Sequence, residues 1–235
     1  MKRLKLNWLQ LAVHIRAWSL VVWLVWDYFT GNLTVNPIQA ATQRTGKIAL
    51  IMLVLSLSCT PLNTLFGWRQ ALATRRILGL YAFLFATTHF LIFSGVDFQF
   101  NWDYLKPEIL EKRYIIVGLA SLSILFLLAV TSFRWWKKRL GRNWKRLHRL
   151  VYLASGLVIL HYAWAKKGDI FRLQGDILQP LFFGILVAML LILRIPVVRS
   201  AVSKLRWRLI QRLSVLESKR QPPDLKQTDV EPFVE

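Results

Sequence analysis

Long apolar runs, separated by shorter polar segments, follow one another along most of the chain. A helix that crosses the hydrocarbon core of a bilayer needs roughly 20 mostly apolar residues, and six runs approach that length. They are the segments 8–29, 47–66, 76–95, 114–133, 147–164 and 177–197. The pattern therefore predicts an all-α fold in which residues 1–197 form a polytopic membrane bundle of six transmembrane helices. No internal repeat is visible among the six runs.

The polarity of the chain changes after the sixth run. Between residues 198 and 213 apolar residues recur at helical spacing among basic ones, which predicts an amphipathic helix lying on an anionic membrane surface. A solvated basic tail is the alternative. The apolar positions are Val198, Ala201, Val202, Leu205, Leu209 and Leu213. The last segment, 214–235, ends in "QPPDLKQTDVEPFVE", and its prolines and weak periodicity predict disorder.

Composition supports a membrane protein and predicts its orientation. The chain is 55% hydrophobic and carries 32 Lys and Arg against 12 Asp and Glu. A soluble nucleic-acid binder rarely combines this much basic and apolar character, so no nucleic-acid partner is expected, and the lipid bilayer is the expected environment. With six spans, 23 of the 32 basic residues lie on the side of the two termini and 8 on the other side. The positive-inside rule then predicts cytoplasmic termini.

Two of the four histidines, His148 and His161, lie in the mostly apolar run "RLHRLVYLASGLVILHYAW". A histidine inside the membrane is a functional-site hypothesis, and a hydrogen bond to a neighbouring helix is the alternative. His89 and His161 both come late in spans that run from inside to outside. A rise of ~1.5 Å per residue places them at similar depth in the outer half of the bilayer. Two imidazoles at one depth can hold a planar cofactor between them, and imidazole suits haem iron.

His148 lies ~20 Å nearer the cytoplasm by the same rise, which leaves room for a second cofactor. On an ideal helix His148 and His161 are roughly 140° apart, so they do not share a face. Haem iron with two axial histidines has no open position and therefore transfers electrons. The single cysteine, Cys59, excludes a covalent CxxCH haem attachment, and a structural zinc site would need four ligands.

Several segments of the chain closely resemble one family of membrane proteins. They are "TGKIAL" at 45, "CTPL" at 59, "TRRILGLYAFLFATTHF" at 74, "RLGRNWKRLHRLVYL" at 139 and "HYAW" at 161. The family comprises the haem-binding membrane subunits of bacterial protein-methionine-sulfoxide reductase systems, within the ferric-reductase-like transmembrane superfamily. The resemblance covers about residues 8–195.

The resemblance implies an integral haem b protein of the bacterial inner membrane, with FMN as a further cofactor. It implies that His89, His148 and His161 are the haem-associated histidines. Members of the family take electrons from the quinone pool or from a cytoplasmic flavin reductase. They pass them to a periplasmic molybdopterin enzyme that reduces methionine sulfoxide in oxidised proteins. The partner would then perform the catalytic reduction, so no catalytic residue is predicted in this chain.

The chain departs from the superfamily pattern of two histidines on each of two helices. Arg75 stands fourteen positions before His89, so an inner haem has no obvious second axial ligand. His14 in the first span lies at a suitable depth for this role, and a helix–helix hydrogen bond is an equal alternative. Arg75 and Arg76 are expected as membrane-surface anchors or as partners of haem propionates. No GxGxxG motif is present, so separate donor and acceptor chains are expected.

Two other functions are compatible with the sequence. The first is a stand-alone quinone-linked cytochrome b or metal reductase of the same superfamily. The second is a non-redox membrane scaffold or transporter, because Pro61 and Pro180 interrupt two spans as in the broken helices of transporters. No inverted repeat accompanies these prolines, and colourless purified protein would distinguish the second function from the redox functions.

Overall fold

The computed structural model describes residues 8–166 and 177–220, and within these ranges the chain is helical without any strand. The all-α prediction is therefore confirmed for the described residues. In chain order the elements are α1 (Trp8–Phe29), α2 (Pro37–Phe66), α3 (Arg69–Leu91), the π-helix η1 (Ile92–Asp97), α4 (Trp102–Glu111), α5 (Arg113–Val130), α6 (Arg134–Leu140), α7 (Arg142–Leu147), α8 (Leu150–Ala165), α9 (Leu178–Ile192) and α10 (Pro196–Arg220).

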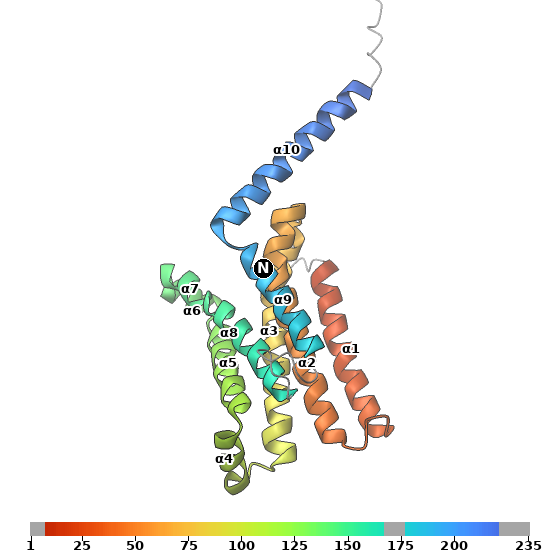
Figure 1. Ribbon diagram of the computed structural model, residues 1–235, viewed down its shortest axis with the longest axis vertical. Helices are drawn as coiled ribbons and strands as arrows, with labels where there is room; N and C mark the ends of the chain where they lie inside the picture. Colours follow the sequence, from red (N-terminus) through yellow and green to blue (C-terminus); the bar gives the residue numbers. More distant parts are fainter. Residues whose placement is uncertain (1–7, 167–176, 221–235) are drawn as a thin grey trace, which may run out of the picture.

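The long helices stand side by side and the short ones close the two ends of the bundle. In Figure 1, α1, α2, α3 and α5 run along the long axis of the molecule, with α4 at the lower end and α6 and α7 toward the upper end. The largest helix–helix interfaces join α2 to α3 and α5 to α8. The bundle is thus built around two helical hairpins, to which α1 and α9 are added.

Four helical segments are long and apolar enough to cross a membrane: α1, α2, α3 together with η1, and α5. A fifth candidate combines α9 with the first part of α10, and the two helices meet at an angle of 77°. The remaining expected span corresponds to α8, which has 16 residues and is shorter than the roughly 20 that a span usually needs. Length and composition thus support four or five of the six expected spans in the described residues.

Helix α2 begins ten residues before the expected start at 47, because its capping residues lie in the preceding loop. The Asn36 side chain accepts a hydrogen bond from the backbone N–H of Gln39 at 3.1 Å, and Pro37 occupies the first turn. The helix ends at Gly67, whose φ of 71° is the left-handed conformation that favours glycine at a helix C-terminus. Its early start adds the segment around Thr42, which the functional site uses.

Small residues allow the helices of the bundle to approach one another closely. Ala17, Ala82 and Ala154 lie on α1, α3 and α8, and each is completely buried. On α1 most large apolar side chains point outward instead, as Trp18 does with an exposed fraction of 61%. This inside-out distribution suits helices surrounded by lipid, where burial of large apolar side chains gives no hydrophobic gain.

Helix α10 turns away from the bundle after Pro196 (Figure 1) and continues to Arg220, past the boundary at 213 that the sequence predicts. The guanidinium of Arg206 lies against Gly67, at the C-terminus of α2, where a positive charge interacts favourably with the helix dipole. The rest of the expected disordered tail, 221–235, lies outside the described residues. A lipid-surface position for α10 stays a prediction.

Candidate functional site

His89 and His161 face each other across the interior of the bundle. His89 lies on α3, just before the chain changes to the π-helix η1, and His161 lies near the end of α8. The centres of the two imidazole rings are 6.0 Å apart, and the ring planes are inclined at 82°. The structure therefore brings together the two histidines that the sequence places at equal depth.

Each of the two imidazoles is fixed by a hydrogen bond from Nδ1 to a backbone carbonyl. The His89 bond goes to Thr42 on α2 at 2.8 Å, and the His161 bond goes to Tyr114 on α5 at 2.7 Å. A carbonyl oxygen can only accept, so Nδ1 must carry the proton and donate it. The Nε2 lone pair of each neutral ring is then free to bind a metal, and such a carbonyl partner commonly orients metal-binding histidines.

The separation of the two rings fits axial ligation of one iron. With a metal–nitrogen bond of about 2.0 Å on each side, two imidazoles on opposite sides of one metal have ring centres roughly 6 Å apart. The observed distance between ring centres is 6.0 Å. Across residues 8–166 and 177–220, no three His, Cys, Asp or Glu side chains gather into a metal-binding group. The donor set here is thus an isolated imidazole pair, which suits haem.

The two halves of this site repeat along the chain. Thr42, Gly46 and His89 have counterparts one hairpin later, at positions 114, 118 and 161, so that each pair is 72 residues apart. Gly46 lies against the His89 ring, and Gly118 lies against the His161 ring. This local correspondence within the site is compatible with the absence of a visible repeat in the sequence. The correspondence is not visible in the sequence, because the carbonyl that accepts the Nδ1 hydrogen bond is a backbone group. Thr42 and Tyr114 therefore supply it equally well although their side chains differ.

His148 lies in the break between α7 and α8. The end of the bundle that carries α6 and α7 is called the inner end, after the orientation that the basic residues predict. Its Nε2 is 3.3 Å from the Thr131 hydroxyl, and its ring lies over Trp144 with 4.1 Å between ring centres. Trp144 in turn donates a hydrogen bond to the Thr131 carbonyl at 2.9 Å. Because α8 begins only at Leu150, the angle of roughly 140° expected for one ideal helix does not apply to His148 and His161.

Three arginines join His148 around a small inner cavity of about 80 Å³, which has no Asp or Glu in its lining. They are Arg75, Arg76 and Arg194. Arg194 donates to the Leu57 carbonyl at 2.6 Å, while its Nε is buried without a hydrogen-bond partner. Guanidinium groups in this arrangement favour carboxylate or phosphate ligands. Sequence reasoning missed Arg194 as a site residue, because it was counted only among the basic residues that predict the orientation.

His14 is not brought to the inner cavity. It lies on α1, and its Nδ1 is 2.6 Å from the hydroxyl of Tyr81 on α3. His14 is absent from the cavity lining, which includes Arg75 and His148. The contact is the helix–helix hydrogen bond that the sequence left open as the alternative to ligation.

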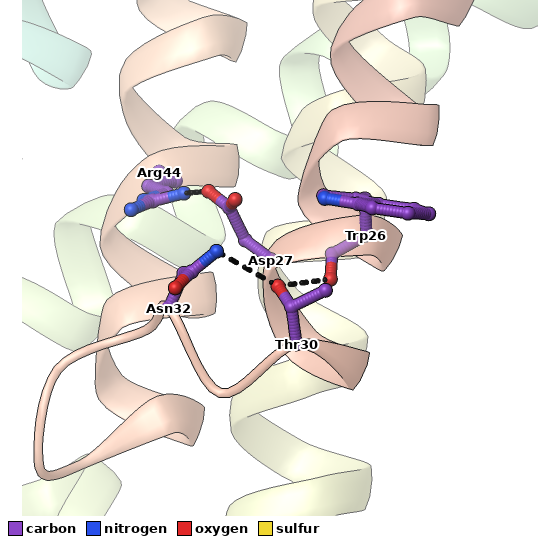
Figure 2. Close-up of polar contacts among 5 residues, drawn as sticks. All are labelled: Trp26, Asp27, Thr30, Asn32 and Arg44. Carbon is purple, nitrogen blue, oxygen red and sulfur yellow. Dashed lines mark hydrogen bonds and ion pairs between the residues drawn. The ribbon is translucent and has the colours of Figure 1, made fainter.

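An ion pair fixes the other end of the bundle, near the His89 half-site. Asp27 at the end of α1 pairs with Arg44 on α2, two positions after Thr42 (Figure 2). The intervening turn is closed by Asn32, whose side chain donates to Thr30 at 2.9 Å. The Arg44 side chain is 42% exposed, so such a pair contributes about 1 kcal/mol at most. The pair links the end of α1 to the segment of α2 that carries the Thr42 carbonyl.

Comparison with known proteins places this arrangement in a family. Residues 40–159 match the family described as the ferric reductase like transmembrane component. The MsrQ heme-binding subunit of protein-methionine-sulfoxide reductase from Rhodospirillum rubrum is 39% identical over 192 residues, which cover 81% of this chain and 89% of the relative. The MsrQ subunit from Deinococcus radiodurans is 42% identical over 166 residues, covering 69% and 80%. No solved structure matches the chain.

The helical bundle and the family match make this chain a ferric-reductase-like transmembrane protein that crosses the membrane several times. Within that class, the similarity over most of both chains shows that it belongs to the MsrQ family.

Proposed function

We propose that the chain is the haem b subunit of a protein-methionine-sulfoxide reductase system of the bacterial inner membrane. It carries electrons to a periplasmic molybdopterin enzyme, which repairs oxidised proteins. The observation that carries the proposal is the His89–His161 pair, with ring centres 6.0 Å apart and both Nδ1 atoms bound to carbonyls. The names of the relatives support it, because they describe heme-binding subunits of such a reductase.

The haem, when bound, supplies a one-electron couple, and the chain's own residues determine what that couple can do. His89 and His161 would hold the iron through Nε2. A haem held by two histidines would supply electron transfer, so the partner chain would carry out the reduction of the sulfoxide. The Thr42 and Tyr114 carbonyls keep both rings in the orientation and tautomer that ligation requires.

The inner cavity is the proposed entry point for electrons. His148, Arg75 and Arg194 would hold an anionic electron carrier there, with the arginines paired to its carboxylates or phosphate. The second haem for which the sequence leaves room is larger than the cavity of about 80 Å³ in this structure. His14 is left out of this proposed ligand set because it bonds to Tyr81. FMN stays a prediction from the resemblance, and its phosphate would need the same arginines. A quinone or a cytoplasmic flavin reductase would deliver electrons at this end.

The proposed topology has six spans, with α8 and α9 as the short fifth and sixth and both termini in the cytoplasm. The basic helices α6 and α7 would then lie on the inner side and α4 on the outer side, in agreement with their positions at opposite ends of the bundle (Figure 1). The 23-to-8 division of Lys and Arg supports this orientation.

Fusions to the C-terminus will test the orientation. A green fluorescent protein fusion should be fluorescent, and an alkaline phosphatase fusion should be inactive, because the phosphatase needs an oxidising compartment. The matched control places the same phosphatase after α4, within the proposed outer loop, where it should be active. The reverse pattern of activities would show that the termini are outside.

Optical and electron paramagnetic resonance spectra of the purified protein will test the haem assignment. Dithionite reduction in detergent should sharpen the α band of low-spin haem b. The 82° angle between the imidazole planes should leave the ferric iron with a strongly anisotropic low-spin signal, because perpendicular axial planes bring the iron d orbitals close in energy. Protein from haem-replete cells that has no Soret band would rule out the haem function.

A further inference from the structure

Two glycines form the surfaces against which the axial imidazoles rest. A Cβ atom added at Gly118 would lie 2.8 Å from Nδ1 of His161, and one added at Gly46 would lie 3.0 Å from Nδ1 of His89. Each glycine follows, by one helical turn, the residue whose carbonyl accepts the Nδ1 bond. The same three-part arrangement of carbonyl, glycine and imidazole thus occurs twice, once on each hairpin.

We propose that Gly46 and Gly118 are positioning residues that set the reduction potential of the haem between His89 and His161. The inference rests on the proposed haem function and deepens it. Any side chain larger than hydrogen at either position would occupy the space that the ring needs in order to reach its carbonyl.

The distances show how a single methyl group would act. Ordinary contact between non-bonded heavy atoms begins at about 3.5 Å, so the methyl group of Gly118→Ala would push the His161 ring back by roughly half an ångström or more. The Nδ1 bond to Tyr114, now 2.7 Å long, would then approach or pass the ~3.2 Å limit of a good N–H···O bond. The helix itself tolerates the change, because alanine is a better helix former than glycine.

Losing the Nδ1 bond changes the electron density of the ligand. An imidazole that donates its Nδ1 proton to a carbonyl is a more basic ligand at Nε2. Greater basicity stabilises ferric iron over ferrous iron, so the two carbonyl bonds keep the potential low. A haem of low potential passes its electron readily to an acceptor outside, which is the direction that the proposed function requires.

The test compares Gly118→Ala, Gly46→Ala and the control Gly156→Ala by potentiometric titration of purified protein. Gly156 lies on α8, as His161 does, but a Cβ atom there would meet nothing within 4 Å. Gly118→Ala should keep its low-spin haem. Its ferric–ferrous equilibrium should shift about tenfold toward ferrous iron, which raises the one-electron reduction potential by about 59 mV. Gly46→Ala should shift in the same direction by less, because its contact is longer.

The remaining measurements distinguish an effect on the position of the imidazole rings from an effect on the stability of the whole protein. Thermal unfolding of Gly156→Ala and of both test variants should be similar, while the potential and the ferric spectrum change only in the test variants. Selective loss of haem from folded Gly118→Ala would also support the proposal, since it reports displacement of His161. If Gly118→Ala gave no monodisperse protein, Gly46→Ala with its milder contact would decide.

Potentials of both test variants equal to those of wild type and Gly156→Ala would overturn the proposal. Failure of the haem site itself looks different, because wild-type protein would then contain no haem. Failure of the repair function alone would leave haem in wild-type protein that methionine sulfoxide does not reoxidise.

Discussion

His89→Ala and His161→Ala should each abolish haem binding at the outer site, which is the site formed by His89 and His161. His148→Ala should leave haem bound at this site. Each of the two rings supplies one of the two axial bonds, and the Nδ1 bonds to Thr42 and Tyr114 hold both rings in place before ligation. Removing even an orienting partner of a ligand commonly costs 10- to 100-fold in metal affinity. Removing the ligand itself should therefore remove the haem at this site almost completely.

The quantity to compare is the amount of haem per polypeptide. It is measured as the pyridine complex of haem after the protein has been purified in detergent. His14→Ala is the matched control, because His14 bonds to Tyr81 and lies outside both proposed ligand sets. It should retain the outer haem fully. The assignment of the two sites would be reversed if His148→Ala removed all haem while His161→Ala removed none.

Reduced haem in membrane vesicles should be reoxidised by the periplasmic partner only when methionine sulfoxide is present. The physical reason is the layout of the site. His148, which lines the inner cavity, follows directly after the basic helix α7, whereas His89 and His161 lie near the opposite ends of α3 and α8. A reductant on the inner side should therefore reduce haem, and a partner docking outside should meet the outer haem first.

The extent of reoxidation should follow the amount of sulfoxide supplied, as read from the α band in right-side-out and inverted vesicles. Vesicles carrying His161→Ala provide the control and should show no such response. Haem that stays reduced with partner and sulfoxide both present would leave a stand-alone cytochrome b or metal reductase, and would remove the repair function. Protein without haem would favour a scaffold or transporter.

The sequence by itself determined the class of the protein and the pairing of two histidines. The length of an apolar run predicts a helix almost regardless of tertiary packing. In lipid the backbone polar groups of a segment must form their hydrogen bonds within that segment. The segment 8–29 coincides with α1 for this reason. A constant rise per residue likewise places His89 and His161 at one depth, since both spans begin at the same side. Equal depth was sufficient to predict that the two rings meet.

Only the tertiary structure decided how the histidines are held. The break before α8 gives His148 its position, and it depends on contacts with Trp144 and Thr131 that span separate elements. Arg194 reaches the inner cavity from the turn after α9, far from Arg75 in the sequence. The site also uses two backbone carbonyls and the missing Cβ atoms of Gly46 and Gly118. Backbone groups are common to every residue, so no pattern of side chains identifies them, and their role is set by which helices pack together.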